Sequence, residues 1–413
     1  MFSDRPLCMI ETNEEVVALA ERLSRAHVIG VDTESDSMYH YQEKVCLIQF
    51  TDAEGDIVVD PLKAKDLSPL KPIFSSRDIV KIYHGADYDV VSLRRDFGFE
   101  TRELFDTLFA AQFLGYPKLG LADLIDRHFG IKVDKQYQRH DWSQRPLRSE
   151  HVEYARGDTH FLLALRELML RELRKAGREP HQREECRFIE DRVWQGRVFN
   201  EDGYLRIKKA NTLDDTGLRI LRRLYLHREN VAQKIDRPPY KVMSDSILLD
   251  IAKHQPDSQR ALDQLFPKKH AMKRRHADAI VASVVDGRDD DFEIPKLRSA
   301  PKPPRDPAVR LTGRAAERVF EALKAWRNAE IDKGHHRSAF TIANNSTLKR
   351  IAARAPTSLE ELAAVPEIRT WQVNDHGASF LQVVAETAAA GPENDDTNAK
   401  PKRRRKRSSP KAD

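Results

Sequence analysis

The sequence is poor in cysteine and has no long apolar run. Its 413 residues include three cysteines (Cys8, Cys46 and Cys186), which are widely separated and form no C-x-x-C pair. This spacing argues against a disulfide framework or a zinc cluster and favours a reducing cytosol. Because no apolar run reaches about 18 residues, no membrane-spanning helix is predicted. The first residues also lack the basic start and apolar core of a signal peptide, so we expect a cytoplasmic protein without a membrane partner.

The sequence also lacks a complete phosphate-binding loop. The segment GYPKLGL, residues 115–121, has the two glycines of a P-loop but not the Lys-Ser/Thr pair that must follow them. This excludes a P-loop helicase, and we expect no nucleotide cofactor.

The positive charge of the chain is concentrated at its end. Without the last fourteen residues, KPKRRRKRSSPKAD, 62 basic and 64 acidic residues remain, which is a nearly neutral body. Such a basic run attracts polyanions through counterion release, without sequence preference. A solvated extension that aids solubility and a nuclear-localisation signal are alternatives. If the tail attracts polyanions, we expect it to bind RNA through Lys402, Arg403, Arg404 and Arg405.

In the first part of the chain, predicted strands are followed by predicted helices. Short β-branched segments bounded by turn residues predict strands at residues 28–33, 45–51, 56–60 and 79–83. The close spacing of the first three predicts antiparallel neighbours. Helical periodicity then predicts helices at 86–97, about 106–114, 119–129 and about 149–175, the last with Ser149 as its N-cap. Strands followed by helices predict an α+β or α/β unit up to about residue 175.

The second half of the chain is predicted to be helical, in two stretches of similar order. Residues 210–288 and 310–388 each contain a long Arg-rich helix, a break and a short Leu/Ile helix, followed by another short helix. This similarity indicates a diverged internal repeat. Five prolines and clustered charge mark residues 289–309 as a linker between the stretches.

Two acids, Asp32 and Glu34, follow the apolar strand VIGV. In a strand, residues two apart point to the same face. The pair repels unless a cation or basic group neutralises it, and Mg²⁺ prefers such oxygen ligands. A D-x-E triplet is common by chance. The alternative to a metal site is that Asp32 and Glu34 are ordinary solvated residues at the end of a strand.

Two further segments place acids beside predicted elements. In HGADYD, Asp87 and Asp89 fall in the first turn of a helix, where either could act as a cap; Asp87 fits that role, and Asp89 could turn toward the end of the first strand. In YARGD, Tyr154 and Asp158 are four residues apart and therefore share one helix face. The alternative is a packed tyrosine beside a surface aspartate. Together, four carboxylates and a phenol match a two-metal phosphodiesterase site, with the phenol positioning or deprotonating the water.

These three segments resemble the three motifs of the DEDD 3′–5′ exonucleases, in the order DTE, HGADYD and YARGD. The tyrosine subclass is matched by Tyr154 and Asp158, whereas the histidine subclass would need a histidine at the position of Glu153. The segments VCLIQF, LFDT and DKQYQRHDWSQRPL resemble the ribonuclease D family, and the two helical repeats resemble HRDC domains.

The resemblance implies an α/β RNase H-like exonuclease domain, a mixed sheet with flanking helices, followed by two all-α HRDC-like domains. The expected boundaries are an exonuclease domain at 1–176, a helical connector at 177–209, a first HRDC domain at 210–288, a linker at 289–309, a degenerate second HRDC domain at 310–388 and a basic tail at 389–413.

The resemblance also implies residue roles. Asp32, Glu34, Asp89 and Asp158 are expected to hold two divalent metal ions, Mg²⁺ or Mn²⁺, and Tyr154 to orient the attacking water. Asp87 and Asp106 are not ligands in the family, which favours structural roles for both. The run containing Lys135, Gln138, Trp142 and Arg145 matches a family segment. Either Trp142 and Pro146 anchor a loop against the core, or Lys135, Gln138 or Arg145 contacts RNA.

The expected function is metal-dependent 3′–5′ exoribonuclease activity that releases 5′-mononucleotides, in tRNA 3′-end maturation and small stable RNA processing. The expected partners are tRNA precursors and other structured RNAs with 3′ extensions, bound by a monomer. A DNA-directed 3′–5′ exonuclease is one alternative, because proofreading domains share these acids. A non-catalytic RNA-binding scaffold is another, but it predicts loss of a metal-binding acid, and all four acids are present.

Overall fold

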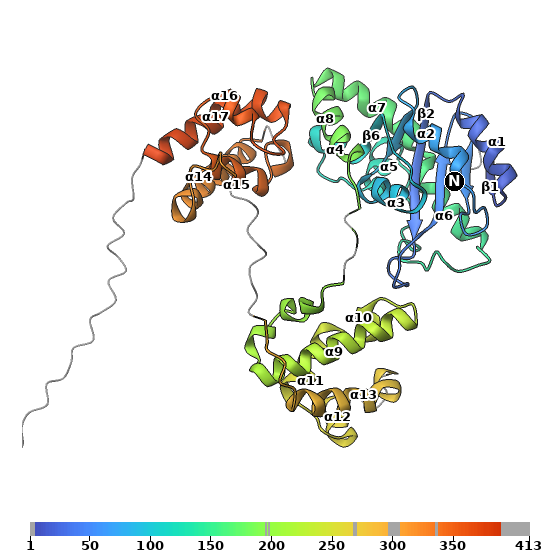
Figure 1. Ribbon diagram of the computed structural model, residues 1–413. Helices are drawn as coiled ribbons and strands as arrows, with labels where there is room; N and C mark the ends of the chain where they lie inside the picture. Colours follow the sequence, from blue (N-terminus) through green and yellow to red (C-terminus); the bar gives the residue numbers. More distant parts are fainter. Residues whose placement is uncertain are drawn as a thin grey trace, which may run out of the picture. The chain divides into compact units, whose positions relative to one another are not determined.

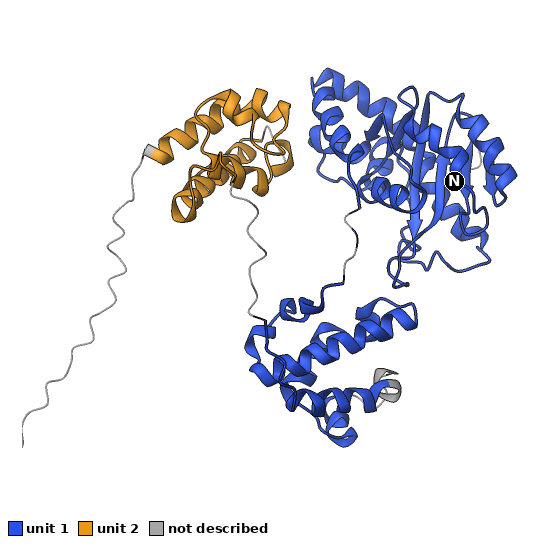
Figure 2. Ribbon diagram, viewed as in Figure 1, with its two compact units in different colours: residues 1–303 blue, residues 304–413 orange. Residues whose placement is uncertain are grey.

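The computed structural model describes residues 5–194, 196, 199–266, 271–295, 306–334 and 338–389. The chain forms two compact units, residues 1–303 and 304–413 (Figure 2). Within the described residues, no helix has the length and apolar character needed to cross a membrane. The three cysteines are free, with Cys8 exposed and Cys46 and Cys186 buried. The basic tail predicted to bind RNA, including Lys402, Arg403, Arg404 and Arg405, lies outside the described residues.

A mixed six-stranded sheet, surrounded by helices α1 to α8, forms the centre of the N-terminal part of the first unit (Figure 1). Its spatial order is β1-β4-β3-β2-β5-β6. The strands are β1 (Leu7–Ile10), β2 (Val28–Ser35), β3 (Val45–Thr51), β4 (Asp56–Val59), β5 (Val80–Tyr83) and β6 (Leu104–Asp106). As predicted, β2, β3 and β4 are antiparallel neighbours, whereas β5 joins β2 in parallel and β6 joins β5 in parallel. The central strand β2 therefore has an antiparallel neighbour on one side and a parallel one on the other.

Helices cover both faces of this sheet. They are α1 (Asn13–Leu23), α2 (Lys71–Ser75), α3 (Asp87–Phe97), α4 (Thr107–Phe113), α5 (Leu121–Phe129), α6 (Ser149–His160), α7 (Leu162–Lys175) and α8 (Glu179–Glu190). On one face, Ile29 and Val31 of β2 join a core with residues of α1, α3 and α8. On the other face, α6 and α7 contact β2. Alternate residues of β2 thus point to different helical layers.

Several details differ from the predicted elements, including β1 and β6, which were not among the predicted strands. The helix expected at 149–175 is broken at Phe161 into α6 and α7. The predicted N-cap Ser149 is wrong, because Arg148 occupies the cap position and Ser149 is the first residue of the helix. The predicted connector begins with α8, whose Cys186 and Ile189 are buried in the core of the sheet domain.

Helices also form the described remainder of the chain, after short 3₁₀ helices at Glu201–Arg206 and Ala210–Thr212. The first unit continues with α9 (Asp215–Lys234), α10 (Pro239–Val242), α11 (Asp245–His254), α12 (Gln259–Leu265) and α13 (Ala271–Arg288). The second unit contains α14 (Gly313–Asp332), α15 (Asn345–Arg354), α16 (Leu359–Ala363) and α17 (Thr370–Ala389).

The two helical domains share an internal arginine contact, which supports the predicted repeat. In the first, the buried Arg228 of α9 donates a 2.7 Å hydrogen bond to Asp245 at the start of α11 and a second one to a backbone carbonyl two residues earlier. In the second, the buried Arg327 of α14 donates a 2.8 Å hydrogen bond to Asn345 at the start of α15, with the same backbone contact. Each arginine thus ties the long helix to the start of the next helix of its repeat.

Candidate active site

The carboxyl end of β2 presents Asp32 and Glu34 to the helical layer formed by α6 and α7. Gly30 lies on the same face of the strand, because it is two residues before Asp32. A Cβ atom at Gly30 would lie 3.3 Å from both the Leu162 Cβ and the Thr159 carbonyl oxygen. The absence of a side chain at Gly30 therefore allows the junction of α6 and α7 to approach the strand that carries the two acids.

Helix α6 carries Tyr154 and Asp158 and is fixed to the sheet by polar contacts. The Arg156 Nε donates a 2.6 Å hydrogen bond to the buried Asp56 of β4, and the His160 Nδ1 lies 2.6 Å from the same carboxylate oxygen. These contacts hold the helix in one register against the sheet. That register turns Tyr154 and Asp158 toward the cleft.

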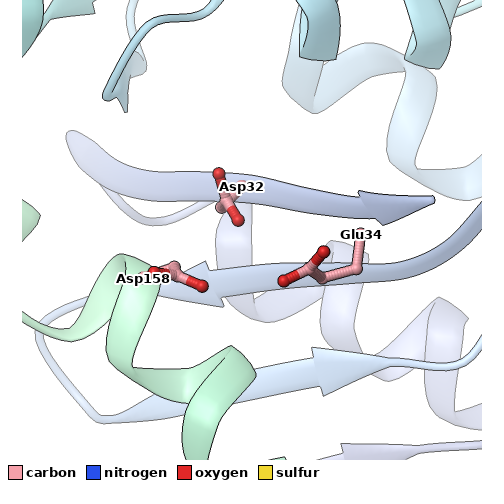
Figure 3. A group of neighbouring side chains, drawn as sticks. All are labelled: Asp32, Glu34 and Asp158. Carbon is pink, nitrogen blue, oxygen red and sulfur yellow. The ribbon is translucent and has the colours of Figure 1, made fainter. Parts of the chain in front are cut away.

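The structure brings three of the four predicted metal-binding acids together. Carboxylate oxygens of Asp32, Glu34 and Asp158 all lie within 4.8 Å of one another. Figure 3 shows Asp158 extending from its helix toward the two acids of β2. Three oxygens at this separation fit the ligand chemistry of a hard divalent cation.

The fourth predicted acid, Asp89, approaches from the opposite helical layer. It lies in the first turn of α3 and is 7% exposed. Its Oδ1 atom accepts a 2.5 Å hydrogen bond from the Thr33 hydroxyl. Asp89 is outside the tight three-carboxylate group, but its charge still acts on that group, because it raises the pKa of both Asp32 and Asp158.

Burial is the largest cause that raises the pKa of all four carboxyls. Repulsion by neighbouring acids of the cluster adds to it for Asp32, Glu34 and Asp158, whereas for Asp89 the repelling charge is that of Asp106. The pKa of Asp158 is raised to about 7 and that of Asp89 to about 6. The pKa values of Asp32 and Glu34 are raised well above their usual range. The cluster therefore resists carrying four negative charges at neutral pH unless cations neutralise it.

This electrostatic strain predicts that the metal-free protein loses stability as pH rises. Because the pKa of Asp158 is higher in the folded chain than the ordinary value of 3.8, the folded state binds more protons than the unfolded state between pH 4 and 7. The free energy of unfolding therefore falls as pH rises through this window. In EDTA at pH 8, Asp158→Asn is expected to raise it by on the order of 1–2 kcal/mol, a few degrees in Tm.

Thermal unfolding at pH 5 and pH 8, with EDTA or with Mg²⁺, measures this effect. Asp87→Asn is the control, because Asp87 is exposed on α3 and pairs with Arg192 instead of the cluster. Equal stability of the metal-free protein at both pH values, or no gain from Asp158→Asn at pH 8, would contradict the prediction.

The acids open into a cleft of about 320 Å³. Its walls come from β2, from the turn after β5, from α5, from the loop that precedes α6 and from α6 itself. The lining residues are Asp32, Thr33, Glu34, His84, Gly120, Leu121, Ala122, Ile125, Val133, Asp134, Lys135, Gln138, Tyr154 and Asp158. Two of the three loop residues predicted to contact RNA, Lys135 and Gln138, are therefore at the cleft.

The third predicted RNA contact, Arg145, is engaged within the protein. Its guanidinium donates two 2.7 Å hydrogen bonds to the Asp60 carboxylate. Further hydrogen bonds go to backbone carbonyls, including that of Trp142. Trp142 itself is buried and packs near Tyr154, with ring centroids 5.9 Å apart. These contacts favour the structural alternative for this part of the loop, in which it is anchored against the core.

Tyr154 is held by aromatic neighbours and keeps its proton. Tyr137 packs edge-on against it, with ring centroids 5.9 Å apart. Burial raises the pKa of Tyr154 above its usual range, and the charges of Asp158, Glu34 and Asp32 raise it further. At neutral pH the phenol therefore offers both a hydrogen-bond donor and an acceptor at the edge of the acid cluster.

Asp106 has a structural role, as expected from the sequence. Its carboxylate accepts hydrogen bonds from the amides of Gly85 and Ala86, at 2.9 and 2.8 Å, and from Leu108, at 2.7 Å. It thereby caps α4 and fixes the turn that leads into α3. Asp106 thus positions Asp89 through the backbone of the HGADYD motif.

Sequence reasoning gave no role to three polar residues of the cleft, Thr33, His84 and Asp134. His84 is the first residue of HGADYD, but a hard divalent cation prefers oxygen ligands, so only the acids of that motif suggest a site. Sequence reasoning also missed the apolar wall formed by Leu121, Ala122 and Ile125. No local pattern marks these residues, because α5 reaches the cleft only through the tertiary fold.

Comparison with known proteins relates the chain to nucleases. A family model described as a 3′-5′ exonuclease matches residues 7–174, and the HRDC domain model matches residues 217–284 and 316–384. The catalytic core of RRP6 from Trypanosoma brucei is 31% identical, with a TM-score of 0.64 over 70% of this chain and 81% of that chain. RNase D from Escherichia coli, an exoribonuclease involved in structured RNA processing, is 27% identical, with a TM-score of 0.64 over 92% and 98% of the two chains.

Relatives named ribonuclease D and relatives named RRP6 or exosome component 10 both match the chain. The exosome complex component 10 homolog of Caenorhabditis elegans is 33% identical over 343 residues, which is 81% of this chain. The chain spans only 38% of the length of that protein. This chain comprises an RNase H-like exonuclease domain followed by two helical HRDC domains.

Proposed function

The chain belongs to the family of 3′–5′ exonucleases with HRDC domains, and from this premise we propose that it removes nucleotides one at a time from RNA 3′ ends. The observation that carries the proposal is the convergence of Asp32, Glu34 and Asp158 beside Tyr154 in one cleft. The proposed substrates are tRNA precursors and other structured small RNAs with 3′ extensions. The similarity to an exoribonuclease of structured RNA supports this choice.

The acids of the cleft fit the divalent metal ions that this class of exonuclease uses. Asp32, Glu34 and Asp158 would hold them, with Asp89 completing the set from the α3 side. When bound, two such ions, Mg²⁺ or Mn²⁺, supply positive charge to the attacking and leaving oxygens of the phosphodiester. The raised pKa values of the acids fit this assignment, because cations relieve the repulsion that raises them.

The remaining cleft residues position the nucleotide and the water. The Tyr154 phenol, at the edge of the acid cluster, orients the attacking water by hydrogen bonding. Lys135 offers a positive charge to the RNA backbone, and Gln138 a neutral donor and acceptor. Leu121 and Ile125 give an apolar wall for the terminal base. The HRDC domains add RNA affinity through phosphate contacts.

Degradation of an end-labelled RNA hairpin with a single-stranded 3′ extension tests the proposal. With Mg²⁺ or Mn²⁺, 5′-labelled RNA is expected to shorten in single-nucleotide steps, and 3′-labelled RNA to release labelled 5′-mononucleotide at once. EDTA is expected to stop both reactions. RNA left intact with both metals would overturn the assignment as an enzyme, and faster degradation of a matched DNA would favour a DNA-directed exonuclease.

A further inference from the structure

His84 occupies a defined position beside the acid cluster. It follows β5, which pairs in parallel with β2 through Gly30 and Ile82. Asp32 comes two residues after Gly30 in β2, and His84 is the first residue after the end of β5, two residues after Ile82. His84 also lines the cleft. The imidazole therefore faces the space that a nucleotide enters, next to the strand that carries the first acid.

The hydrogen bonds of Thr107 determine which nitrogen of His84 carries the proton. The Thr107 hydroxyl donates a 3.0 Å hydrogen bond to the Tyr83 carbonyl oxygen. A hydroxyl has one proton, and the carbonyl oxygen can only accept it. The Thr107 hydroxyl oxygen therefore acts as the acceptor in its second contact, with the His84 Nδ1 atom 2.9 Å away. The Nδ1 atom must therefore carry hydrogen and donate it. In a neutral imidazole this leaves a lone pair on Nε2.

The imidazole of His84 is neutral at physiological pH. Burial lowers its pKa to about 4. A neutral ring with hydrogen on Nδ1 is an acceptor at Nε2 and cannot serve there as a donor or a cation. His84 thus adds to the cleft an acceptor that is not a carboxylate, is not expected to bind the metals and, unlike Gln138 and Tyr154, offers the cleft no donor.

We propose that the His84 Nε2 accepts a hydrogen bond from a ribose hydroxyl of the 3′-terminal nucleotide, and so contributes to selection of RNA over DNA. The inference rests on the proposed function, because it assumes that a 3′ nucleotide fills the cleft. The acids fix where the scissile phosphate lies, and the terminal ribose is bonded directly to that phosphate.

The position of His84 favours the sugar over the base as the donor. His84 lines the same cleft as the acid cluster, to which the scissile phosphate and its ribose must come close, whereas the apolar Leu121, Ile125 and Val133 suit the flat faces of a base. A ribose hydroxyl is present on every nucleotide, so this contact is compatible with removal of any terminal residue. The 2′-hydroxyl is also the group by which proteins distinguish RNA from DNA.

The test compares kcat/KM for three RNAs that differ only in the last sugar: ribose, 2′-deoxyribose or 3′-deoxyribose. For the wild-type chain, loss of the contacted hydroxyl is expected to lower kcat/KM about fivefold, the effect of one neutral hydrogen bond. In His84→Leu, which has no acceptor, that penalty is expected to shrink to less than about twofold. His84→Gln, which retains an acceptor, is expected to keep part of the penalty and decides the outcome if the leucine variant does not fold.

Each result has a distinct meaning. An equal sugar penalty in the wild type and in His84→Leu, or no penalty in the wild type for either deoxy sugar, would overturn the proposal. The same series of sugars, repeated with each of the four terminal bases, tests whether the base is the hydrogen-bond donor instead. If the effect of His84→Leu depends on the base and not on the sugar, the proposal is overturned as well. Failure of the wild type to degrade any of these RNAs would instead reject the proposed function.

Discussion

Replacement of Asp32 by asparagine is expected to lower kcat for removal of RNA 3′ nucleotides by about a thousandfold or more. Asp32 is one of the three acids whose oxygens lie within 4.8 Å of one another, and asparagine has the same shape without the charge. Loss of a metal-binding carboxylate removes several kcal/mol of charge stabilisation, and each 1.36 kcal/mol is about a tenfold change in rate. Single-turnover degradation of 5′-labelled RNA in Mg²⁺ measures the change.

The matched control is Asp87→Asn, which removes an acid from the HGADYD motif outside the cleft. Because Asp87 pairs with Arg192 and does not line the cleft, its loss is expected to change kcat less than about twofold. Thermal unfolding in EDTA separates inactivity from misfolding, since Asp32→Asn removes a repulsive charge and is expected to preserve or increase stability. Near-normal activity of a folded Asp32→Asn variant would reject this acid as a metal ligand.

Replacement of Tyr154 by phenylalanine is expected to lower kcat by about a hundredfold, with a smaller effect on KM. The substitution keeps the ring contacts with Tyr137 and Trp142 and removes only the hydroxyl. Loss of one positioned hydrogen-bonding group in an active site costs about 10²–10³-fold in kcat, and we expect the lower end for the Tyr154 hydroxyl. Steady-state kinetics on the same RNA, at saturating Mg²⁺, give both constants.

Tyr137→Phe provides the comparison, because Tyr137 packs against Tyr154 but does not line the cleft. Its activity is expected to stay within a few-fold of the wild type. If the two phenylalanine variants lose activity equally, the hydroxyl of Tyr154 has no special role and the aromatic cluster acts only as packing. An increase in KM for Tyr154→Phe, with kcat unchanged, would show that the hydroxyl contributes to RNA binding and not to the chemical step.

Short-range geometry explains why much of the site could be predicted from the sequence. Asp32 and Glu34 share a face because strands alternate with a period of two, and Tyr154 and Asp158 share a face because four residues make about one helical turn. The antiparallel order of β2, β3 and β4 followed from short connections. Each of these relationships depends only on residues close together in the chain.

The features that could not be predicted depend on contacts between distant residues. Strand β1 is four residues long and becomes a strand through its parallel partner β4, which lies about fifty residues later. The Asp89 carboxylate lies with Thr33 and apart from the tight acid group because α3 covers the other face of the sheet. The role of Arg145 was ambiguous for the same reason, since its partner Asp60 is 85 residues away.

The contacts between α6 and the sheet bear on how the four-residue spacing of Tyr154 and Asp158 can change during evolution. Arg156 and His160, which fix the helix to Asp56, alternate along it with the two cleft residues. One inserted residue after Gly157 would turn Asp158 by about 100° and move His160 off its partner at the same time. An insertion or deletion would thus damage fold and site together. Residues of this helix can therefore be substituted during evolution, but its length between Tyr154 and His160 cannot change.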